Sequence, residues 1–233
     1  MFTKSAPFYD AIYAFKDYED EAERLRAMIQ ARVPSSEVTL LDVACGTRLH
    51  LQYLKKQYAV EGLDLDPNML EIAHRRCPGV PFHQGDLVAF DLGRSFDVVM
   101  CLFSSIGYAK TLGRMQQAVQ TMARHLRPGG LLLVEPWLTP DVFETGRFDA
   151  RFVDEPDLKI ARITTTSREG ALSIIDFHYL VGTSDGVVHF TERHEMGLFT
   201  DHQYLDAFRA AGLAIDFDPD GFMGRGLYLA TAQ

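Results

Sequence analysis

Long apolar runs, paired cysteines and an excess of positive charge are all missing from this sequence of 233 residues. No apolar stretch approaches the roughly 18 residues of a membrane span, and no secretory leader is evident. The 3 cysteines include no CxxC pair, which counts against a zinc site and favours a reduced intracellular protein. A net charge of −9 argues against nucleic acid or an anionic membrane as the main partner. We therefore expect a cytoplasmic protein without a metal.

The nicotinamide-type motif G-x-G-x-x-G is also missing, which counts against a dehydrogenase. The first half of the chain nevertheless alternates strands and helices, a pattern typical of a doubly wound parallel sheet. Arg127–Gly130 has the composition of a helix stop followed by a tight turn. The expected strands are 39–42, 59–64, 81–84, 97–101 and 130–134, and the expected helices are 49–57, 67–76 and 113–126.

The alternation stops after residue 136. The stretches 158–167, 171–182 and 187–198 are rich in Ile, Thr, Val, Phe and Tyr and are separated by turn residues, which predicts three antiparallel strands. The pattern then returns with a helix over 201–211 and strands over 213–217 and 227–231. We expect one domain with a Rossmann-like, mostly parallel seven-stranded sheet. Its parts are an N-terminal helical lid, a cofactor-binding core, an inserted antiparallel sheet over the acceptor site, and a return to the core sheet (1–37, 38–136, 137–198 and 199–233).

The stretch Leu40–His50 organises this pattern. A short apolar run ends at Asp42 and breaks into a loop of small residues before the next helix. Strand, tight loop and helix in this order place backbone N–H groups at the edge of a parallel sheet, where they suit an extended polar ligand. Asp64 ends the second strand, at the spacing at which nucleotide-binding sheets place a ribose acceptor. Gly85 and Asp86 follow the third strand.

These stretches resemble the class I S-adenosylmethionine-dependent methyltransferases: LLDVACGT resembles their first motif, EGLDLDPNML their second, and HQGDL their adenine-binding acid. The resemblance implies that Asp64 accepts the ribose hydroxyls and Asp86 the adenine amino group. The backbone from Ala44 through Cys45 to Gly46 would face the methionine part. The cofactor would be S-adenosylmethionine, with S-adenosylhomocysteine as product. Further cofactor contacts would come from Tyr13, Tyr18, Asp42, Leu65, Met69, Gly85, Leu87, Cys101, Leu102 and Phe103.

The later motifs CLFSSIGY, ARHLRPGG, VEPW, IDFHYLV and GRGLY resemble a narrower group, the bacterial N-methyltransferases that dimethylate nucleotide-linked amino sugars. This implies methyl transfer to the amine of a small-molecule acceptor, by a monomer or homodimer. The resemblance implies that Arg225 is a cation that contacts the substrate. Arginine suits a diphosphate because two of its N–H groups can bind phosphate oxygens at the same time. It also places Tyr9, Ser105, Trp137 and His178 along the acceptor pocket.

The N-terminal segment precedes this core. A helix is expected over 18–33, and Tyr9, Tyr13 and Tyr18 lie at or before its start. These tyrosines would either have a purely structural packing role or close over the site as a lid that reaches the cofactor and substrate. The resemblance favours the lid. An alkylammonium acceptor must lose a proton before it attacks. Tyr9, Tyr13 and His178 are the candidate bases, and the sequence does not rank them.

Arg48 departs from the family pattern, since it stands where the first motif usually has its third glycine. Ala44 stands at another position where glycine is common. An arginine beside the ligand loop would either point outward or pair with the methionine carboxylate, and we favour the outward orientation. Two alternatives remain: an O-methyltransferase of a small carboxylate or hydroxyl metabolite, and a non-catalytic member that binds a ligand or partner.

Overall fold

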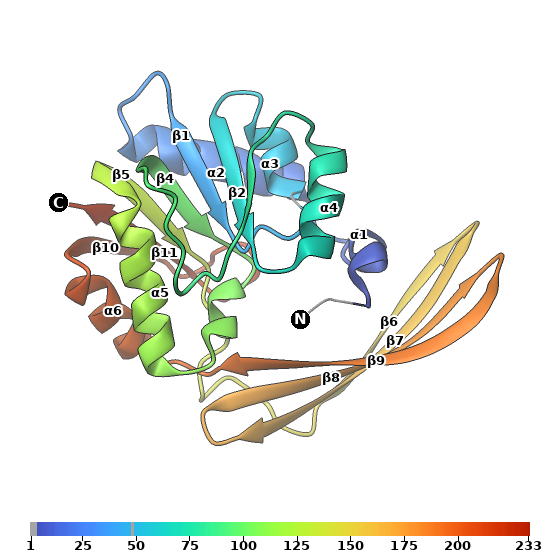
Figure 1. Cartoon of the computed structure of the whole chain (residues 1–233). Helices are drawn as coiled ribbons and strands as arrows, with labels where there is room; N and C mark the ends of the chain where they lie inside the picture. The colour runs from blue at the N-terminus through green and yellow to red at the C-terminus, as the bar shows by residue number, and fades with distance from the viewer. Residues whose placement is uncertain (1–3, 48) are drawn as a thin grey trace.

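Two β-sheets of different kind form the frame of the molecule (Figure 1), and the computed structural model describes residues 4–47 and 49–233. The larger sheet has seven strands in the order β10-β11-β5-β4-β1-β2-β3. Its strands pair in parallel except around β11, which is antiparallel to both β5 and β10. The smaller sheet is an antiparallel meander in the order β6-β7-β8-β9.

The helices among the described residues are η1 (Ala6–Phe8), α1 (Tyr9–Ile12), α2 (Tyr18–Arg32), α3 (Leu49–Leu54), α4 (Pro67–Arg76), η2 (Ser105–Ala109), α5 (Leu112–Arg124) and α6 (Asp201–Ala210). The strands are β1 (Thr39–Val43), β2 (Ala59–Asp64), β3 (Phe82–Gln84), β4 (Phe96–Cys101), β5 (Leu126–Val134), β6 (Phe148–Glu155), β7 (Leu158–Glu169), β8 (Leu172–Thr183), β9 (Gly186–Gly197), β10 (Leu213–Asp218) and β11 (Leu227–Ala232). None of these helices combines the length and the apolar character of a membrane span.

Helix starts follow from capping side chains. Asp66 caps α4 by accepting a hydrogen bond from the Asn68 N–H, and Pro67 occupies the first helical position. Thr200 and Gln203 form a reciprocal capping box at the start of α6. Because α4 begins directly after β2, its start fixes the course of the chain at the carboxyl edge of the large sheet. The predicted bounds of β2 and α4 are those observed.

One predicted turn is part of a strand instead. Arg127–Gly130 belongs to β5, whose pairing with β4 jumps from Phe96↔Leu126 to Val98↔Leu131. Gly129 absorbs the extra length with a φ of 74°, a conformation that glycine adopts without strain. A bulge therefore carries β5 through residues whose composition is typical of a turn.

The second sheet has four strands rather than the three predicted. The additional strand is β6, whose sequence begins FDARF and places Phe148, Ala150 and Phe152 on one face, but this apolar face is exposed. Phe148 and Phe152 are exposed on one side, while Arg151 lies on the other. Backbone pairing with β7 along its whole length, rather than burial, maintains β6. The short alternation in FDARF was a weak strand signal, and it points to the wrong buried face, because the phenylalanines are exposed.

Three buried clusters position the site. Two pack against the large sheet, one including Leu41, Val99 and Leu132 and the other including Leu40, Val98 and Leu131. Neighbouring residues of a strand fall in different clusters because successive side chains point to opposite faces. The third cluster joins Ile12 and Tyr13 of the N-terminal segment to the inner face of the antiparallel sheet, at Ile160, Ile175, Phe177, Tyr179, Val181 and Met196. In Figure 1, α1 lies between the two sheets.

A buried charge network anchors the N-terminal segment to the core. Lys16 Nζ lies 2.7 Å from Glu21 Oε1, and His50 Nε2 lies 2.7 Å from Glu21 Oε2. Burial raises the pKa of Glu21, but hydrogen bonds from His50 and Lys16 outweigh burial and leave the pKa below its ordinary value. The ionised carboxylate therefore stabilises the folded state above the ordinary carboxyl pKa, and this contribution fades as the pH falls through the lowered value.

We expect Glu21→Gln to lower the free energy of unfolding near neutral pH by about 3 kcal/mol, because it leaves the Lys16 ammonium buried without a carboxylate. Urea unfolding measures the change, and Glu19→Gln on the exposed face of the same helix is the control. The difference from the parent should shrink in acid, where Glu21 is protonated. Equal stability of both variants at neutral pH would contradict the structural role of this network.

Candidate functional site

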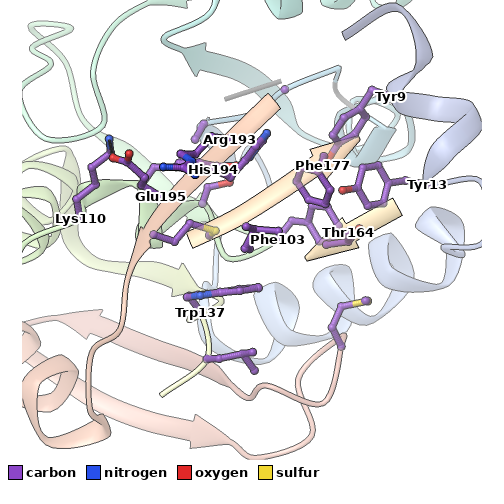
Figure 2. Close-up of a pocket in the computed structure, with 18 of the residues that line it drawn as sticks. Tyr9, Tyr13, Phe103, Lys110, Trp137, Thr164, Phe177, Arg193, His194 and Glu195 are labelled. Carbon is purple, nitrogen blue, oxygen red and sulfur yellow. Dashed lines mark hydrogen bonds and ion pairs between the residues drawn. The ribbon is translucent and has the colours of Figure 1, made fainter. Parts of the chain in front are cut away.

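A cavity of about 760 Å³ lies between the carboxyl edge of the large sheet and the antiparallel sheet. It is lined from α1, from the loops after β1, β2, β3, β4 and β5, and from the second sheet. Figure 2 shows Tyr9, Tyr13, Phe103, Trp137, Phe177 and His194 around it. A smaller pocket of about 50 Å³ shares Tyr9, Ala44, Gly46, Phe103 and Ser105 with it. Residues from distant parts of the sequence thus converge on one space.

The loop after β1 is held in an unusual backbone conformation. Ala44 and Gly46 both have positive φ, at 57° and 55°. A left-handed alanine is strained, which explains why glycine suits this position. The Gly46 N–H donates to Asp64 Oδ2 at 2.7 Å, and the Asp66 N–H donates to Asp64 Oδ1 at 2.9 Å. The carboxylate at the end of β2 therefore fixes the loop and itself borders the cavity.

Most residues predicted to contact a cofactor lie together. The large cavity is lined by Tyr13, Ala44, Gly46, Asp64, Leu65, Met69, Gly85, Asp86, Leu87 and Phe103. The smaller pocket adds Tyr18, Asp42, Cys45 and Leu102. Asp86 also accepts a hydrogen bond from Arg114 Nη2 at 2.9 Å. Asp64 and Asp86, predicted to hold opposite ends of a nucleoside, thus border the same cavity.

One predicted cofactor position, Cys101, falls outside this description, and the predicted outward orientation of Arg48 concerns a residue that the structure does not describe. Cys101 is fully buried in the core and lines neither pocket, so its predicted contact is wrong. Burial raises the pKa of its thiol far above the ordinary value, and nearby carboxylates add to the effect. Cys101 is the last residue of β4, one position before the chain turns toward the pocket. Arg48 lies outside the described residues.

The loop after β4 shapes the floor of the cavity. Phe103 and Ser104 have φ values of 53° and 60°, and the Phe103 N–H donates to Glu135 Oε2 at 2.7 Å. Glu135 is buried, and Arg225 Nη2 lies 3.6 Å from its other oxygen. Burial raises the pKa of Glu135, although Arg225 opposes the shift. Arg225 lines the cavity as predicted, with its guanidinium 5.3 Å from the centre of the Trp137 ring.

The tyrosines of α1 and its C-terminal cap reach the cavity. The rings of Tyr9 and Tyr13 are 4.6 Å apart, and Tyr13 meets Phe103 edge-on at 5.2 Å. Burial raises the pKa of both phenols, most strongly for Tyr9. Both phenols therefore stay protonated near neutral pH, which makes them hydrogen-bonding groups rather than bases.

α1 is tied directly to the loop after β1. Asp10 accepts a hydrogen bond from Thr47 Oγ1 at 2.8 Å and also pairs with Arg76 at the end of α4. Arg76 in turn donates to the Thr47 carbonyl at 2.8 Å. This three-residue contact holds Tyr9 and Tyr13 over the predicted cofactor side of the cavity.

His178 does not face the acceptor side, so this prediction is wrong. Successive residues of a strand point to opposite faces. Phe177 and Tyr179 are buried on the inner face of β8, which turns His178 outward. Its ring is exposed and stacks 6.1 Å from His189, and it does not line the cavity.

His194 of β9 is the histidine that sequence reasoning missed. Its side chain is buried and lines the cavity, with Nδ1 2.6 Å from the Tyr108 hydroxyl and Nε2 4.0 Å from Glu192 Oε2. Burial lowers the pKa of His194, although Glu192 opposes the shift. The ring is therefore neutral near neutral pH. Glu192, His194 and Met196 alternate along β9 on the face that its register with β8 makes the inner one.

The remaining predicted acceptor residues, Ser105 and Trp137, line the cavity. Trp137 is held by a 2.9 Å hydrogen bond from Nε1 to Ser173 Oγ. The residues on the other side fit an adenosyl group: two carboxylates that can accept hydrogen bonds stand at or just after strand ends, with the apolar side chains of Leu65, Met69, Leu87 and Phe103 beside them.

A family model described as a methyltransferase domain matches residues 40–130. The dTDP-3-amino-3,6-dideoxy-alpha-D-glucopyranose N,N-dimethyltransferase of Streptomyces fradiae is 42% identical, over 96% of this chain and 89% of that protein. The crystal structure of Streptomyces venezuelae DesVI aligns with a TM-score of 0.91 at 39% identity, over 97% of both chains. SAM-bound CalS10, an amino pentose methyltransferase from Micromonospora echinaspora, aligns at 0.88 with 38% identity, again over 97% of both chains. The chain belongs to the S-adenosylmethionine-dependent methyltransferases, in the group that contains these sugar N-methyltransferases.

Proposed function

We propose that the protein transfers methyl groups from S-adenosylmethionine to the amino nitrogen of a nucleotide-linked amino sugar. One observation carries the proposal: a single cavity joins the acids at the ends of β2 and β3 to a half lined by tyrosines, His194 and arginines under the antiparallel sheet. Relatives named as N,N-dimethyltransferases of dTDP-amino sugars support the acceptor class. The reaction takes place in the cytoplasm, with the enzyme a monomer or homodimer.

The parts of the chain divide this work. Residues 1–37 form a lid, 38–136 bind the cofactor, 137–198 cover the acceptor and 199–233 complete the large sheet. When bound, S-adenosylmethionine supplies an electrophilic methyl group on a sulfonium. Asp64 accepts the ribose hydroxyls, Asp86 accepts the adenine amino group, and the backbone at Ala44–Gly46 faces the methionine part. The aromatic residues Tyr9, Tyr13 and Phe103 exclude water and restrict the acceptor, and positioning of this kind lowers such a barrier by up to roughly 7–11 kcal/mol.

A proton path leads away from the acceptor amine. Burial raises the pKa of Tyr108, so its hydroxyl stays protonated and donates to His194 Nδ1. Burial also raises the pKa of Glu192, but the nearby His194 and hydrogen bonds from Ser5 outweigh it and lower the pKa to about 2. The ionised Glu192 favours the tautomer with the proton on His194 Nε2. The Tyr108 oxygen can then accept the ammonium proton while its own proton passes to His194 Nδ1.

The cofactor assignment is tested with Asp64→Asn. Loss of the charged acceptor should weaken S-adenosylhomocysteine binding about tenfold, corresponding to roughly 1.4 kcal/mol. Calorimetry gives the affinity, and Asp157→Asn, on an exposed turn far from the cavity, is the matched control. Unchanged affinity in a folded Asp64 variant would remove Asp64 from the cofactor site. Absence of binding in the parent protein would favour a non-catalytic family member.

The lid assignment is tested by hydrogen exchange. Backbone amides of residues 4–18 should become more protected when S-adenosylhomocysteine binds, because Tyr9 and Tyr13 gain a partner in the cavity. Asp10→Asn should lower this protection by loosening the contact with Thr47 and Arg76. Equal protection with and without ligand would instead favour a permanent packing role.

The proton path is tested by the pH dependence of kcat. Because the pKa of His194 is lowered, its neutral form persists near neutral pH and is lost only in more acid solution. His194→Asn should reduce kcat about 10²-fold and remove this acid limb, and Tyr108→Phe should act in the same direction. His189→Asn, on the outer face of the same strand, should leave the profile unchanged. A parent-like profile for His194→Asn would exclude this path.

A further inference from the structure

Two arginines stand directly opposite each other on the edge strand β6 and the neighbouring strand β7 of the antiparallel sheet. Arg151 of β6 and Arg162 of β7 are register partners, so their side chains leave the sheet on the same face, and both line the cavity. Like charges directly opposite on paired strands repel each other and destabilise the pairing. Such an arrangement calls for a negative charge between them.

No carboxylate of the described residues forms an ion pair with either guanidinium, although the chain has 32 acidic against 23 basic residues. Asp149, two positions before Arg151 on the same face, also lines the cavity without pairing with it. Arg162 is only 6% exposed. The Nε atoms of both arginines are buried without a hydrogen-bond partner among the described residues. Burying a cation without an anionic partner raises the free energy of the folded protein, unless a bound ligand supplies the negative charge.

Four other cations of the cavity wall are already paired with carboxylates, whereas Arg147, directly before β6, is exposed and forms no ion pair among the described residues. The four ion pairs are Lys110–Glu195 at 2.7 Å, Arg114–Asp86 at 2.9 Å, Arg193–Asp176 at 2.8 Å and Arg225–Glu135 at 3.6 Å. Arg225, which the sequence suggested for a diphosphate, is therefore committed to a buried carboxylate. The positive charge available to an anionic ligand lies instead on the antiparallel sheet, at Arg151 and Arg162, with the exposed Arg147 directly before β6.

Aromatic faces orient both guanidinium groups. Arg162 lies 4.8 Å from the Phe177 ring centre and donates to the Tyr13 hydroxyl at 3.2 Å, while Arg151 lies 4.0 Å from the Phe15 ring centre. Stacking on a ring leaves the planar N–H edges of arginine free to meet oxygens. Thr164, one step along the inner face of β7, adds a hydroxyl beside Tyr13 and Phe177 (Figure 2).

We propose that Arg151 and Arg162 together form the subsite that binds the diphosphate of the acceptor, an inference that rests on the proposed function. Each guanidinium offers two parallel N–H groups, and two adjacent phosphates offer matching pairs of oxygens. The bound diphosphate neutralises the opposed arginines. Through Arg162 it also fixes the Tyr13 hydroxyl, so the nucleotide part of the acceptor helps to position a tyrosine at the cofactor side.

The test measures binding of thymidine diphosphate and of thymidine, which lacks the phosphates, to the full-length protein by calorimetry. Arg151→Gln and Arg162→Gln should each weaken thymidine diphosphate binding about tenfold or more while changing thymidine binding less than about twofold. Arg162→Lys keeps the charge but loses the two parallel N–H groups of the guanidinium. Its affinity for thymidine diphosphate should therefore lie between those of Arg162→Gln and the parent. Arg168→Gln, an exposed arginine of β7 outside the cavity, is the matched control and should bind like the parent.

S-adenosylhomocysteine affinity and thermal unfolding of the same variants report whether the fold and the cofactor side remain intact. Parent-like binding of thymidine diphosphate by both glutamine variants would overturn the subsite, as would absence of binding in the parent. The proposed function fails separately: mass spectrometry would then detect no methylated product from any nucleotide-linked amino sugar tried, even with the arginine-dependent binding intact. If methylation occurs but the arginine variants bind like the parent, the function stands and the diphosphate subsite is rejected.

Discussion

The carboxylate of Asp64 holds the site together. It accepts the Gly46 N–H at 2.7 Å, while the neighbouring Cys45 N–H donates to the Leu63 carbonyl at 3.0 Å. These two bonds extend the parallel pairing of β1 and β2 one step past the end of β1 and stop the loop from relaxing out of its left-handed conformations. The strain at Ala44 is tolerated because its surroundings fix it from both sides. Thr47, at the end of this rigid loop, donates a hydrogen bond to Asp10. This bond connects the loop to the N-terminal segment that carries Tyr9 and Tyr13.

The antiparallel sheet depends on the same segment. Its inner face carries Phe177 and Tyr179, which are covered where Ile12 and Tyr13 pack against them. Near the chain start, the Ser5 N–H donates to Glu192 of β9 at 3.0 Å. The N-terminal residues thus contact both the loop after β1 and the inner face of the second sheet. Because one short segment bridges both halves of the cavity, movement of that segment would change both halves together.

Sequence patterning predicted the large sheet because its strands and helices obey local rules. Apolar runs, the proline at the start of α4 and the spacing of Asp42, Asp64 and Asp86 all carry information within a few residues. β6 was missed because its alternating stretch is short and its apolar residues are exposed, so pairing with β7 rather than burial maintains it.

The errors at His178 and Cys101 concern direction rather than position in the chain. Ile175, Phe177, Tyr179 and Val181 alternate in β8, and this alternation already implies that His178 points outward. The direction of His194 was harder to foresee, since β9 carries polar residues on both faces and only its register with β8 decides which face is inner. Cys101 lies one residue before the chain turns toward the cavity, so a shift of a single position separates core from site.

The distribution of charge around the cavity matches two ligands of opposite charge. Asp64 and Asp66 border the side at the end of β2, with Asp86 beside them in an ion pair with Arg114. Among the described residues, Arg151 and Arg162 stand on the antiparallel sheet without carboxylate partners. A sulfonium is attracted to the first region and a diphosphate to the second, and exchanging them would set like charges against each other on both sides. Tyr13 lies at the boundary, hydrogen-bonded to Arg162 and in edge contact with Phe103. With the proposed diphosphate subsite, electrostatics would orient both ligands before any specific contact to the sugar forms. Shape and hydrogen bonding would then only have to align the amine with the methyl group.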